Sequence, residues 1–245
     1  MRLLVLFALA AATACAPPSS TLTLSPRASV RSTDTPRAPT ATAIGVVRYV
    51  AIGASDTVGV GATDPVTGSW PARVATQLPT GSAFVNVGVS GSTAPQAREQ
   101  QLPRAIAQKP SVVSIWLAVN DMNAQIAPDA YHDALAAIVD GLAARTDAKV
   151  FVGSVPDIRG VPAYKDADKA LLFQQITAYN EAVASVVRAY RGRAFAVDLF
   201  TGSAPLVSTL TVSEDGFHPS DEGYRLIAER FAKAMRDQGI PLRAG

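Results

Sequence analysis

Several residue types are scarce in this chain of 245 residues, which contains one cysteine, two histidines and only 17% charged residues. A lone cysteine excludes an internal disulfide framework. The formal net charge is +2, and no cluster of lysine and arginine with interleaved aromatic residues is present. The composition therefore offers no electrostatic basis for nucleic-acid binding. The low charge and the hydrophobic content of 48% exclude a disordered chain and predict one domain with a sizeable core.

The N-terminus has a short apolar segment, residues 3–14, which follows Arg2 and is too short to span a bilayer comfortably. It leads into Ala12-Thr13-Ala14-Cys15, which resembles a bacterial lipobox, although Ala12 stands where a large apolar residue is usual. We expect residues 1–14 to be a signal peptide and Cys15 to be lipidated. Ala12 and Ala14 also suit ordinary signal peptidase cleavage, which would release a secreted protein without a lipid.

Residues 15–43 are rich in proline, serine, threonine, alanine and arginine and show almost no apolar periodicity. Such a segment cannot bury enough surface to offset the entropy lost on ordering. We therefore expect a disordered tether over residues 15–43 and a folded domain over residues 44–245. A lipid on Cys15 would associate the domain with a membrane, at the cell surface or in the periplasm.

Short apolar runs rich in β-branched residues alternate with longer helical patterns from residue 44 onward. Several runs are almost continuously apolar, which is typical of strands buried on both faces of a parallel sheet. Strands are predicted over residues 46–52, 83–87, 111–117, 149–153 and 194–198. Helices are predicted over residues 70–78, 93–108, 129–145, 166–190 and 221–238. This alternation predicts a doubly wound, three-layer α/β/α sandwich with a five-stranded parallel sheet.

Polar residues and glycines follow the predicted strands, at the sheet edge where α/β proteins bind their ligands. Ser55 follows the first strand, Gly91 the second and Asn120 the third. The pair Asp215 and His218 lies beyond the fifth strand. We therefore expect these residues to gather at one edge of the sheet.

A serine hydrolase needs a hydroxyl, an imidazole and a carboxylate. Ser55 is the candidate nucleophile, because Gly53 permits a tight turn that exposes the hydroxyl. Asp215 can accept the Nδ1 proton of His218 and leave Nε2 free as a base. Each motif is weak alone, since Ser55 also suits a turn and His218 also suits the surface.

Two other acids, Asp198 and Asp221, compete with Asp215 for the role of orienting His218. The spacing in the sequence favours Asp215. The second histidine, His132, lies in an amphipathic helical pattern, and we expect it to be a solvated surface residue.

Asn120 and Gly91 are candidate donors to an oxyanion. The side-chain amide of Asn120 can donate a hydrogen bond, and Gly91 can offer its backbone N–H because it has no side chain. Both residue types are also common in ordinary turns.

These blocks together resemble the SGNH hydrolase superfamily, also called GDSL lipases and esterases. They occur in family order and at family-like spacing, and they read Gly53-Ala54-Ser55-Asp56, Ser90-Gly91-Ser92-Thr93, Ala118-Val119-Asn120-Asp121 and Asp215-Gly216-Phe217-His218. The resemblance implies a flavodoxin-like fold with Ser55 as nucleophile, His218 as base and Asp215 as its orienter. It also implies an oxyanion hole formed by the N–H groups of Ser55 and Gly91 and by Asn120.

Two residues depart from the family pattern. Ala54 stands where an aspartate is common, and Ala118 stands where a glycine is usual. Neither change removes a catalytic group. The added methyl of Ala118 is expected to narrow the pocket or to shift Asn120 slightly.

The resemblance predicts a serine esterase that cleaves small carboxylic esters through an acyl-enzyme and needs neither a cofactor nor a metal ion. Short-chain acyl or acetyl esters of lipids or carbohydrates are the favoured substrates, and residues 58–65 and 203–214 are expected to shape the acyl pocket. Two other functions stay open. One is a non-catalytic, surface-binding lipoprotein on the same fold. The other is a metal-dependent phosphoesterase whose ligands would be Asp56, Asn120, Asp215 and His218.

Overall fold

A five-stranded parallel sheet forms the centre of the domain in the computed structural model, which describes residues 45–207 and 210–243. The strand order is β2-β1-β3-β4-β5. The strands are β1 (Arg48–Gly53), β2 (Ala83–Asn86), β3 (Val112–Trp116), β4 (Lys149–Gly153) and β5 (Ala194–Val197). Each overlaps its predicted range, and the predicted parallel sheet is confirmed. The predicted signal peptide, Cys15 and the tether up to residue 43 lie outside the described residues.

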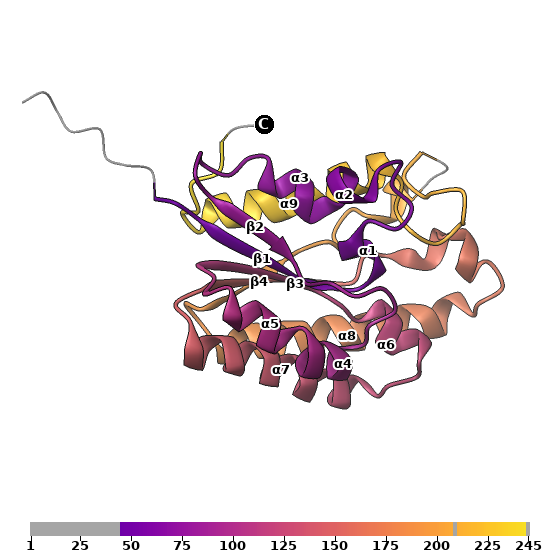
Figure 1. The fold of residues 1–245 in the computed structure, drawn as a ribbon. Coiled ribbons are helices and arrows are strands. Elements are labelled where there is room, and N and C mark those ends of the chain that lie inside the picture. Colours follow the sequence, from indigo (N-terminus) through magenta and orange to yellow (C-terminus); the bar gives the residue numbers. More distant parts are fainter. Residues whose placement is uncertain (1–44, 208–209, 244–245) are drawn as a thin grey trace, which may run out of the picture. The chain divides into compact units, whose positions relative to one another are not determined.

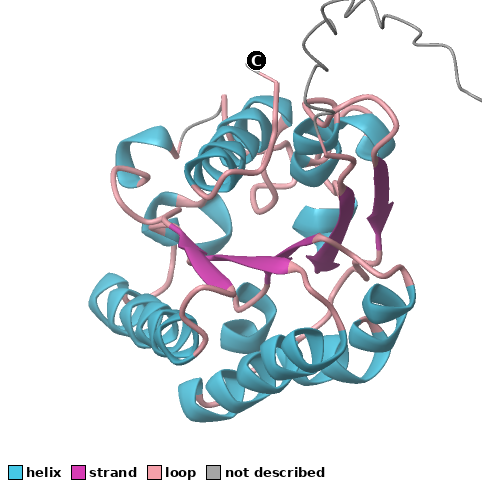
Figure 2. Cartoon of the chain, turned by 90° about the vertical axis from the view of Figure 1, so that its left-hand side faces the viewer, coloured by secondary structure: helices cyan, strands magenta, loops and turns pink. Residues whose placement is uncertain are grey.

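Helices cover both faces of the sheet (Figures 1 and 2). One face carries α3 (Trp70–Ala75) and α9 (Asp221–Asp237). The other carries α4 (Ala94–Gln100), α5 (Leu102–Ala107), α7 (Pro128–Arg145) and α8 (Lys169–Ala189). Short turns occupy the connections, namely α1 (Ser55–Val58), α2 (Pro65–Gly68), α6 (Val119–Asn123), η1 (Ile158–Gly160), η2 (Pro162–Tyr164) and η3 (Ala204–Leu206). These layers confirm the predicted α/β/α sandwich.

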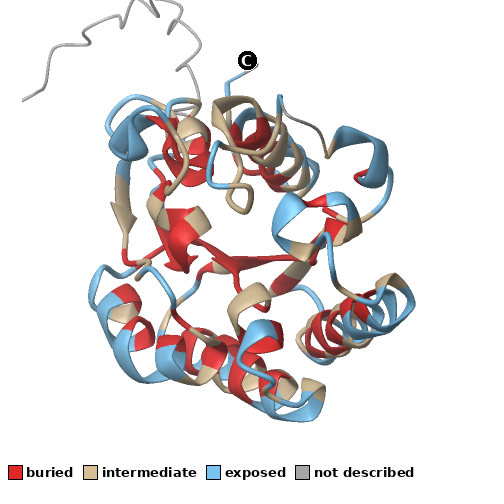
Figure 3. Ribbon diagram, turned by 90° about the vertical axis from the view of Figure 1, so that its right-hand side faces the viewer, coloured by how far each residue is buried: buried red, intermediate tan, exposed pale blue. Residues whose placement is uncertain are grey.

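Each face of the sheet packs against its own apolar core, and the strands between the two cores are largely buried (Figure 3). On the face covered by α3 and α9, Trp70 stacks on Phe231 with ring centroids 4.0 Å apart. On the other face, Ile52 and Leu135 are fully buried. Burial on both sides explains why the strands appear in the sequence as nearly continuous apolar runs. No helix among residues 45–207 and 210–243 is both long and apolar enough to cross a membrane.

Side-chain caps define where two of the long helices begin. Ser220 precedes α9, and its Oγ accepts a hydrogen bond from the Gly223 N–H at 3.3 Å, so the predicted cap is confirmed. Asp168 caps α8 by accepting from the N–H groups of Ala170 and Leu171. An N-cap residue lies just outside its helix, so a cap at Asp168 makes Lys169 the first residue of α8. The helix therefore begins three residues after the predicted start at residue 166.

The predicted helix over residues 93–108 is wrong in one respect, because α4 ends and α5 begins on either side of Gln101. Pro103 lacks an N–H group, and its ring clashes with the carbonyl of the residue four positions earlier, so one regular helix cannot continue through it. Gln101, at the junction of the two helices, is completely buried, as are Ala97 and Ala105 one turn before and after it.

Candidate active site

Ser55 is the first residue of α1 and follows β1 after a single intervening residue. The turn requires Gly53, because a Cβ atom there would lie 1.9 Å from Oγ1 of Thr57. The first N–H groups of a helix have no partner within the helix, so the start of α1 presents donors to a developing negative charge. Ser55 itself is buried, with 6% of its surface exposed.

The structure brings Ser55, His218 and Asp215 together in one chain of hydrogen bonds. Nε2 of His218 lies 2.9 Å from Oγ of Ser55, and Nδ1 lies 2.6 Å from Oδ2 of Asp215. The other carboxylate oxygen of Asp215 accepts hydrogen bonds from the Ser213 hydroxyl and from the N–H groups of Phe217 and His218. The tight loop therefore holds both the acid and the imidazole in place.

The electrostatics of Asp215 favour its charged form. Partial burial raises the pKa of this carboxyl, but the hydrogen bonds from His218, Phe217 and Ser213 outweigh that effect and lower the pKa well below its ordinary value. An ionised Asp215 can only accept, so Nδ1 of His218 carries the proton. Nε2 is then left unprotonated toward the Ser55 hydroxyl, which is the arrangement that a general base needs.

The competing acids and the second histidine lie elsewhere. Asp198 accepts hydrogen bonds from the N–H groups of Phe200 and Thr201, and Asp221 binds the Thr63 hydroxyl and Arg73. His132 is on α7, where its Nδ1 contacts Asp133 and its side chain is 35% exposed.

The two candidate oxyanion donors lie on loops that are bonded to each other. Nδ2 of Asn120 donates to the carbonyl of Ser92 at 3.1 Å, and Gly91 precedes that serine with a φ of 80°. Oδ1 of Asp121 accepts from the Ala94 N–H at 2.9 Å and ties the same two loops together. Because an amide NH₂ has two hydrogens, Asn120 keeps one for another acceptor.

Ala118 has a strained backbone. Its φ is 95° and its ψ is −41°, a conformation that glycine adopts far more readily than alanine. The residue also precedes α6, whose second residue is Asn120. The departure from the usual glycine therefore acts on the backbone that carries Asn120, which bears on the second of the two expected effects, a shift of Asn120, rather than on a narrower pocket.

Gln101 is a site-supporting residue that the sequence did not reveal. Its Oε1 accepts from the N–H of Gly53, and its Nε2 donates to the carbonyl of the same residue, both at 2.9 Å. Nearby, Nδ2 of Asn86, the last residue of β2, donates to the carbonyl of Thr57 and braces α1. A glutamine in a helical pattern is ordinarily a solvated residue, so only the break before Pro103 hinted that Gln101 differs.

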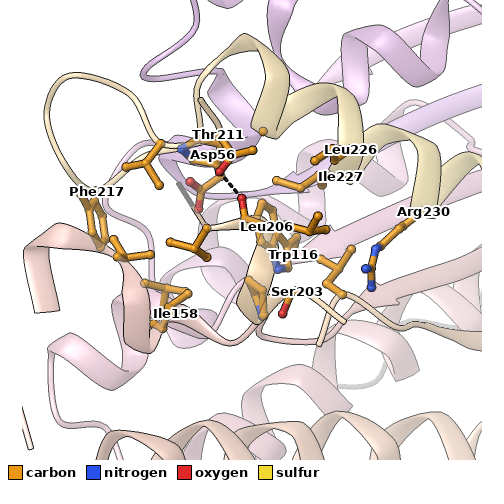
Figure 4. Close-up of a pocket in the computed structure, with 18 of the residues that line it drawn as sticks. Asp56, Trp116, Ile158, Ser203, Leu206, Thr211, Phe217, Leu226, Ile227 and Arg230 are labelled. Carbon is orange, nitrogen blue, oxygen red and sulfur yellow. Dashed lines mark hydrogen bonds between the residues drawn. The ribbon is translucent and has the colours of Figure 1, made fainter. Parts of the chain in front are cut away.

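A mostly apolar pocket of about 120 Å³ opens beside the triad, between the loops after β3, β4 and β5 and helix α9 (Figure 4). Its wall includes Trp116, Val119, Ile158, Leu206, Phe217 and Ile227. Part of the predicted segment 203–214 lines this pocket, namely Ser203, Leu206, Val207, Thr211 and Val212. Gly61, Ala62 and Thr63 of the other predicted loop line a second, more polar hollow beside Asp215.

Asp56 places a carboxylate in the wall of this apolar pocket, directly after the nucleophile. Burial raises its pKa to about 6, and the nearby Asp215 charge acts in the same direction while His218 opposes the shift. The sequence suggested Asp56 only as a metal ligand. No group of three or more histidine, cysteine, aspartate or glutamate residues in the described part of the chain is arranged to hold a metal ion.

A family model for the GDSL-like lipase/acylhydrolase family matches residues 51–226, a range that contains the whole triad. The chain belongs to this family. Membership makes it a carboxylic ester hydrolase, and the family's α/β fold is the one described above. No curated protein sequence matches the chain significantly.

Solved structures share the fold at low sequence identity. TesA has a TM-score of 0.62 and 22% identity, over 78% of this chain and 99% of TesA. A histidine-to-alanine catalytic mutant of an acetylxylan esterase from Geobacillus stearothermophilus has a TM-score of 0.63 and 22% identity, over 80% of this chain and 96% of that chain. A family 3 carbohydrate esterase from Clostridium thermocellum has a TM-score of 0.60 and 22% identity, over 79% of this chain and 96% of the esterase.

Proposed function

We propose that the protein is a serine esterase that acts through a Ser55–His218–Asp215 triad and an acyl-enzyme intermediate. The observation that carries this proposal is the continuous hydrogen-bond chain, 2.9 Å from Ser55 Oγ to His218 Nε2 and 2.6 Å from His218 Nδ1 to Asp215 Oδ2. Catalytic mutants of the acetylxylan esterase with the same fold carry alanine in place of a serine or a histidine, which supports the same pair of roles here.

The reaction follows from this geometry. His218 Nε2 takes the Ser55 proton while Oγ attacks the ester carbonyl, and the carbonyl electron pair moves onto oxygen. The N–H groups of Ser55 and Gly91 and the Asn120 amide stabilise that oxyanion. When the intermediate collapses, the alcohol leaves with the proton from His218. Water then gives a proton to His218 and attacks the acyl-enzyme. As the bond from the acyl carbon to Ser55 Oγ breaks, His218 returns that proton to Oγ, and the acid is released.

The substrates we favour are short-chain acyl or acetyl esters of lipids or carbohydrates. The pocket beside Asp56 and Phe217 is apolar and limited in volume, which suits an acyl group rather than a sugar ring. Two proteins with the same fold are an acetylxylan esterase and a carbohydrate esterase, which supports acetylated sugars as one substrate class. We further propose that residues 1–14 direct export and that a lipid on Cys15 attaches the enzyme to a membrane.

Labelling with a fluorophosphonate tests the triad directly, because this reagent reacts with an activated serine. We expect an adduct on Ser55, located by mass spectrometry, and its loss in His218→Ala. A panel of esters from acetyl to octanoyl then defines the acyl preference. A folded protein that forms no adduct and turns over no ester would favour the binding-protein function. Activity that disappears on chelation would favour the metal-dependent phosphoesterase.

A further inference from the structure

The pocket beside the triad carries very little charge. Among the described residues that line it, only Asp56 and Arg230 are charged. Arg230 is held at the β5 side, where its Nη1 donates to the carbonyls of Asp198 and Thr201. In Figure 4, Arg230 lies on the opposite side of the pocket from Phe217, with Trp116 and Leu206 between them. Among these lining residues the Asp56 carboxylate is therefore the one acidic group, and it directly follows Ser55 in the sequence.

Asp56 forms no salt bridge with any lysine or arginine among residues 45–207 and 210–243. In the described part of the chain, no other residue's side chain donates a hydrogen bond to the Asp56 carboxylate. The Asp215 carboxylate, by contrast, accepts four hydrogen bonds. The groups that act on Asp56 are His218 and Asp215. Burial raises the pKa values of Tyr164 and Tyr224, and the nearby Asp56 charge adds to this rise, so both phenols are neutral at ordinary pH. At pH 8 the Asp56 carboxylate is ionised, because its raised pKa is about 6.

We propose that Asp56 is a specificity-determining residue that selects acyl groups without negative charge and weakens the binding of the carboxylate product. The inference rests on the proposed function, since it assigns the apolar pocket to the acyl group. A neutral ester places no charge beside Asp56. Hydrolysis of the acyl-enzyme produces a carboxylic acid that loses its proton to become an anion, at the point where the acyl carbon had been bonded to Ser55.

The physical reason is the low polarity of the surrounding wall. Two like charges a few ångströms apart repel each other more strongly when buried side chains such as Trp116 surround them than when water does. Arg230 is instead anchored to the carbonyls of Asp198 and Thr201 at the β5 side of the pocket. Asp56 therefore separates substrate from product by charge, although the two have the same hydrocarbon chain.

Binding of a matched pair of ligands tests the proposal without requiring turnover. Hexanamide and hexanoate have the same chain and differ in charge, and their affinities can be measured by NMR titration at pH 8. We expect the wild-type protein to bind hexanamide at least about tenfold more tightly than hexanoate, equivalent to 1.4 kcal/mol. In Asp56→Asn the ratio should fall at least about fivefold, mainly through tighter hexanoate binding.

Two control variants distinguish a local effect from a general one. Asp56→Glu keeps the charge and should keep most of the discrimination. Glu214→Gln removes one charge from the exposed loop that carries the triad acid, outside the apolar pocket, and should leave the ratio at the wild-type value.

The proposal is overturned by a wild-type ratio near one, by failure of both ligands to bind, or by an equal loss of discrimination in Glu214→Gln. The wild-type measurement decides even if Asp56→Asn does not fold. Ester turnover with a ratio near one would refute the role of Asp56 and leave the esterase proposal intact. If the wild-type protein shows the expected ratio and Asp56→Asn abolishes it, but the protein turns over no ester, the role of Asp56 stands and the esterase proposal fails.

Discussion

The side-chain amide of Gln101 spans the peptide groups of Gly53, with Oε1 accepting from the N–H and Nε2 donating to the carbonyl, both at 2.9 Å. Gly53 is the last residue of β1, and Ser55 begins α1 two residues later. A buried glutamine between two helices on one face of the sheet thus fixes the end of the strand from which the nucleophile projects. Gln101 acts as a positioning residue, because it contacts the backbone beside Ser55 rather than the reacting atoms.

Replacing Gln101 should destabilise the protein. Gln101→Leu keeps the volume but leaves the buried Gly53 N–H without its partner, and we expect a loss of about 2 kcal/mol or more in the free energy of unfolding. Urea unfolding measures this loss. Gln100→Ala, at an exposed position on α4, is the matched control and should change stability by less than about 0.5 kcal/mol. Equal stabilities for the two variants would contradict the role of Gln101.

Asp215 should be essential for turnover, and Asp198 should not. Asp215→Asn removes the charge that orients and stabilises the His218 imidazole, and in another hydrolase triad the same change lowers kcat by roughly 10⁴-fold. We expect a loss of at least about 10²-fold with a short-chain nitrophenyl ester. Asp198→Asn is the matched control, because Asp198 caps a turn instead of contacting His218. The assignment of the acid fails if Asp215→Asn retains wild-type kcat.

Activity should rise with pH across the range in which histidines lose their proton, about pH 5 to 8. The depressed pKa of Asp215 keeps this group charged throughout that range, so its own protonation does not set the acid limb. A general base must be unprotonated to act, so activity is lost where the base is protonated, and Asp56, whose pKa is raised to about 6, titrates within the same range. Steady-state kcat/KM as a function of pH is the measurement, and a flat profile between these limits would count against His218 as the base.

Ala118→Gly should stabilise the protein. The φ of 95° strains an alanine, and strain of this kind costs on the order of 1–3 kcal/mol. Glycine relieves it but loses up to about 1 kcal/mol through the greater freedom of the unfolded chain, so a net gain of about 1 kcal/mol is expected. Ala137→Gly makes the same exchange within α7, where the backbone is helical, and should instead cost about 1 kcal/mol. Thermal or urea unfolding compares the two, and a loss in both variants would mean that Ala118 is not strained.

Asp121→Asn should make the protein more stable at neutral pH. Burial raises the pKa of Asp121 to about 6 from its ordinary value of 3.8, and its Oδ2 has no hydrogen-bond partner in the described part of the protein. The folded state therefore holds a proton that the unfolded state has already released, so stability falls as the pH rises from about 4 to about 6.

The size of this penalty is on the order of 2–3 kcal/mol once the pH exceeds about 6. Asparagine carries no such penalty and keeps an acceptor for the Ala94 N–H. We expect the difference in unfolding free energy between Asp121→Asn and wild type to grow in favour of the variant between pH 4 and pH 7. Asp147→Asn, at a fully exposed aspartate, should show no such trend. A constant difference across this range would show that Asp121 is ionised in the folded state.

Prediction from the sequence succeeded where local chemistry decides the structure. The run from Arg48 to Gly53 is a strand because its apolar side chains are buried on both faces, and this requirement is visible in the residues themselves. The cap at Ser220 was predictable for a similar reason, since one hydroxyl satisfies the open N–H groups of the turn that follows it. The contact between Asp215 and His218 also follows from a local feature, the three-residue spacing within one tight loop, whereas the catalytic role of Asp215 stays a prediction.

Contacts between distant segments were beyond such reasoning. Gln101 and Gly53 are 48 positions apart, and nothing in either segment indicates that the two residues are hydrogen-bonded to each other. The positive φ of Ala118 and the place of Asp56 in the pocket wall likewise depend on how several loops meet after the sheet has formed.

The sequence by itself thus determined the alternation of strands and helices, the identity of the four family blocks and the acid that precedes His218. These features depend on side-chain periodicity, turn chemistry and short-range hydrogen bonds. Only the tertiary structure decided which carboxylate lines the apolar pocket, which amide braces the turn before Ser55 and where the backbone is strained. The reason is that parallel strands bring residues far apart in the chain to one edge of the sheet, and the contacts made there depend on packing in three dimensions.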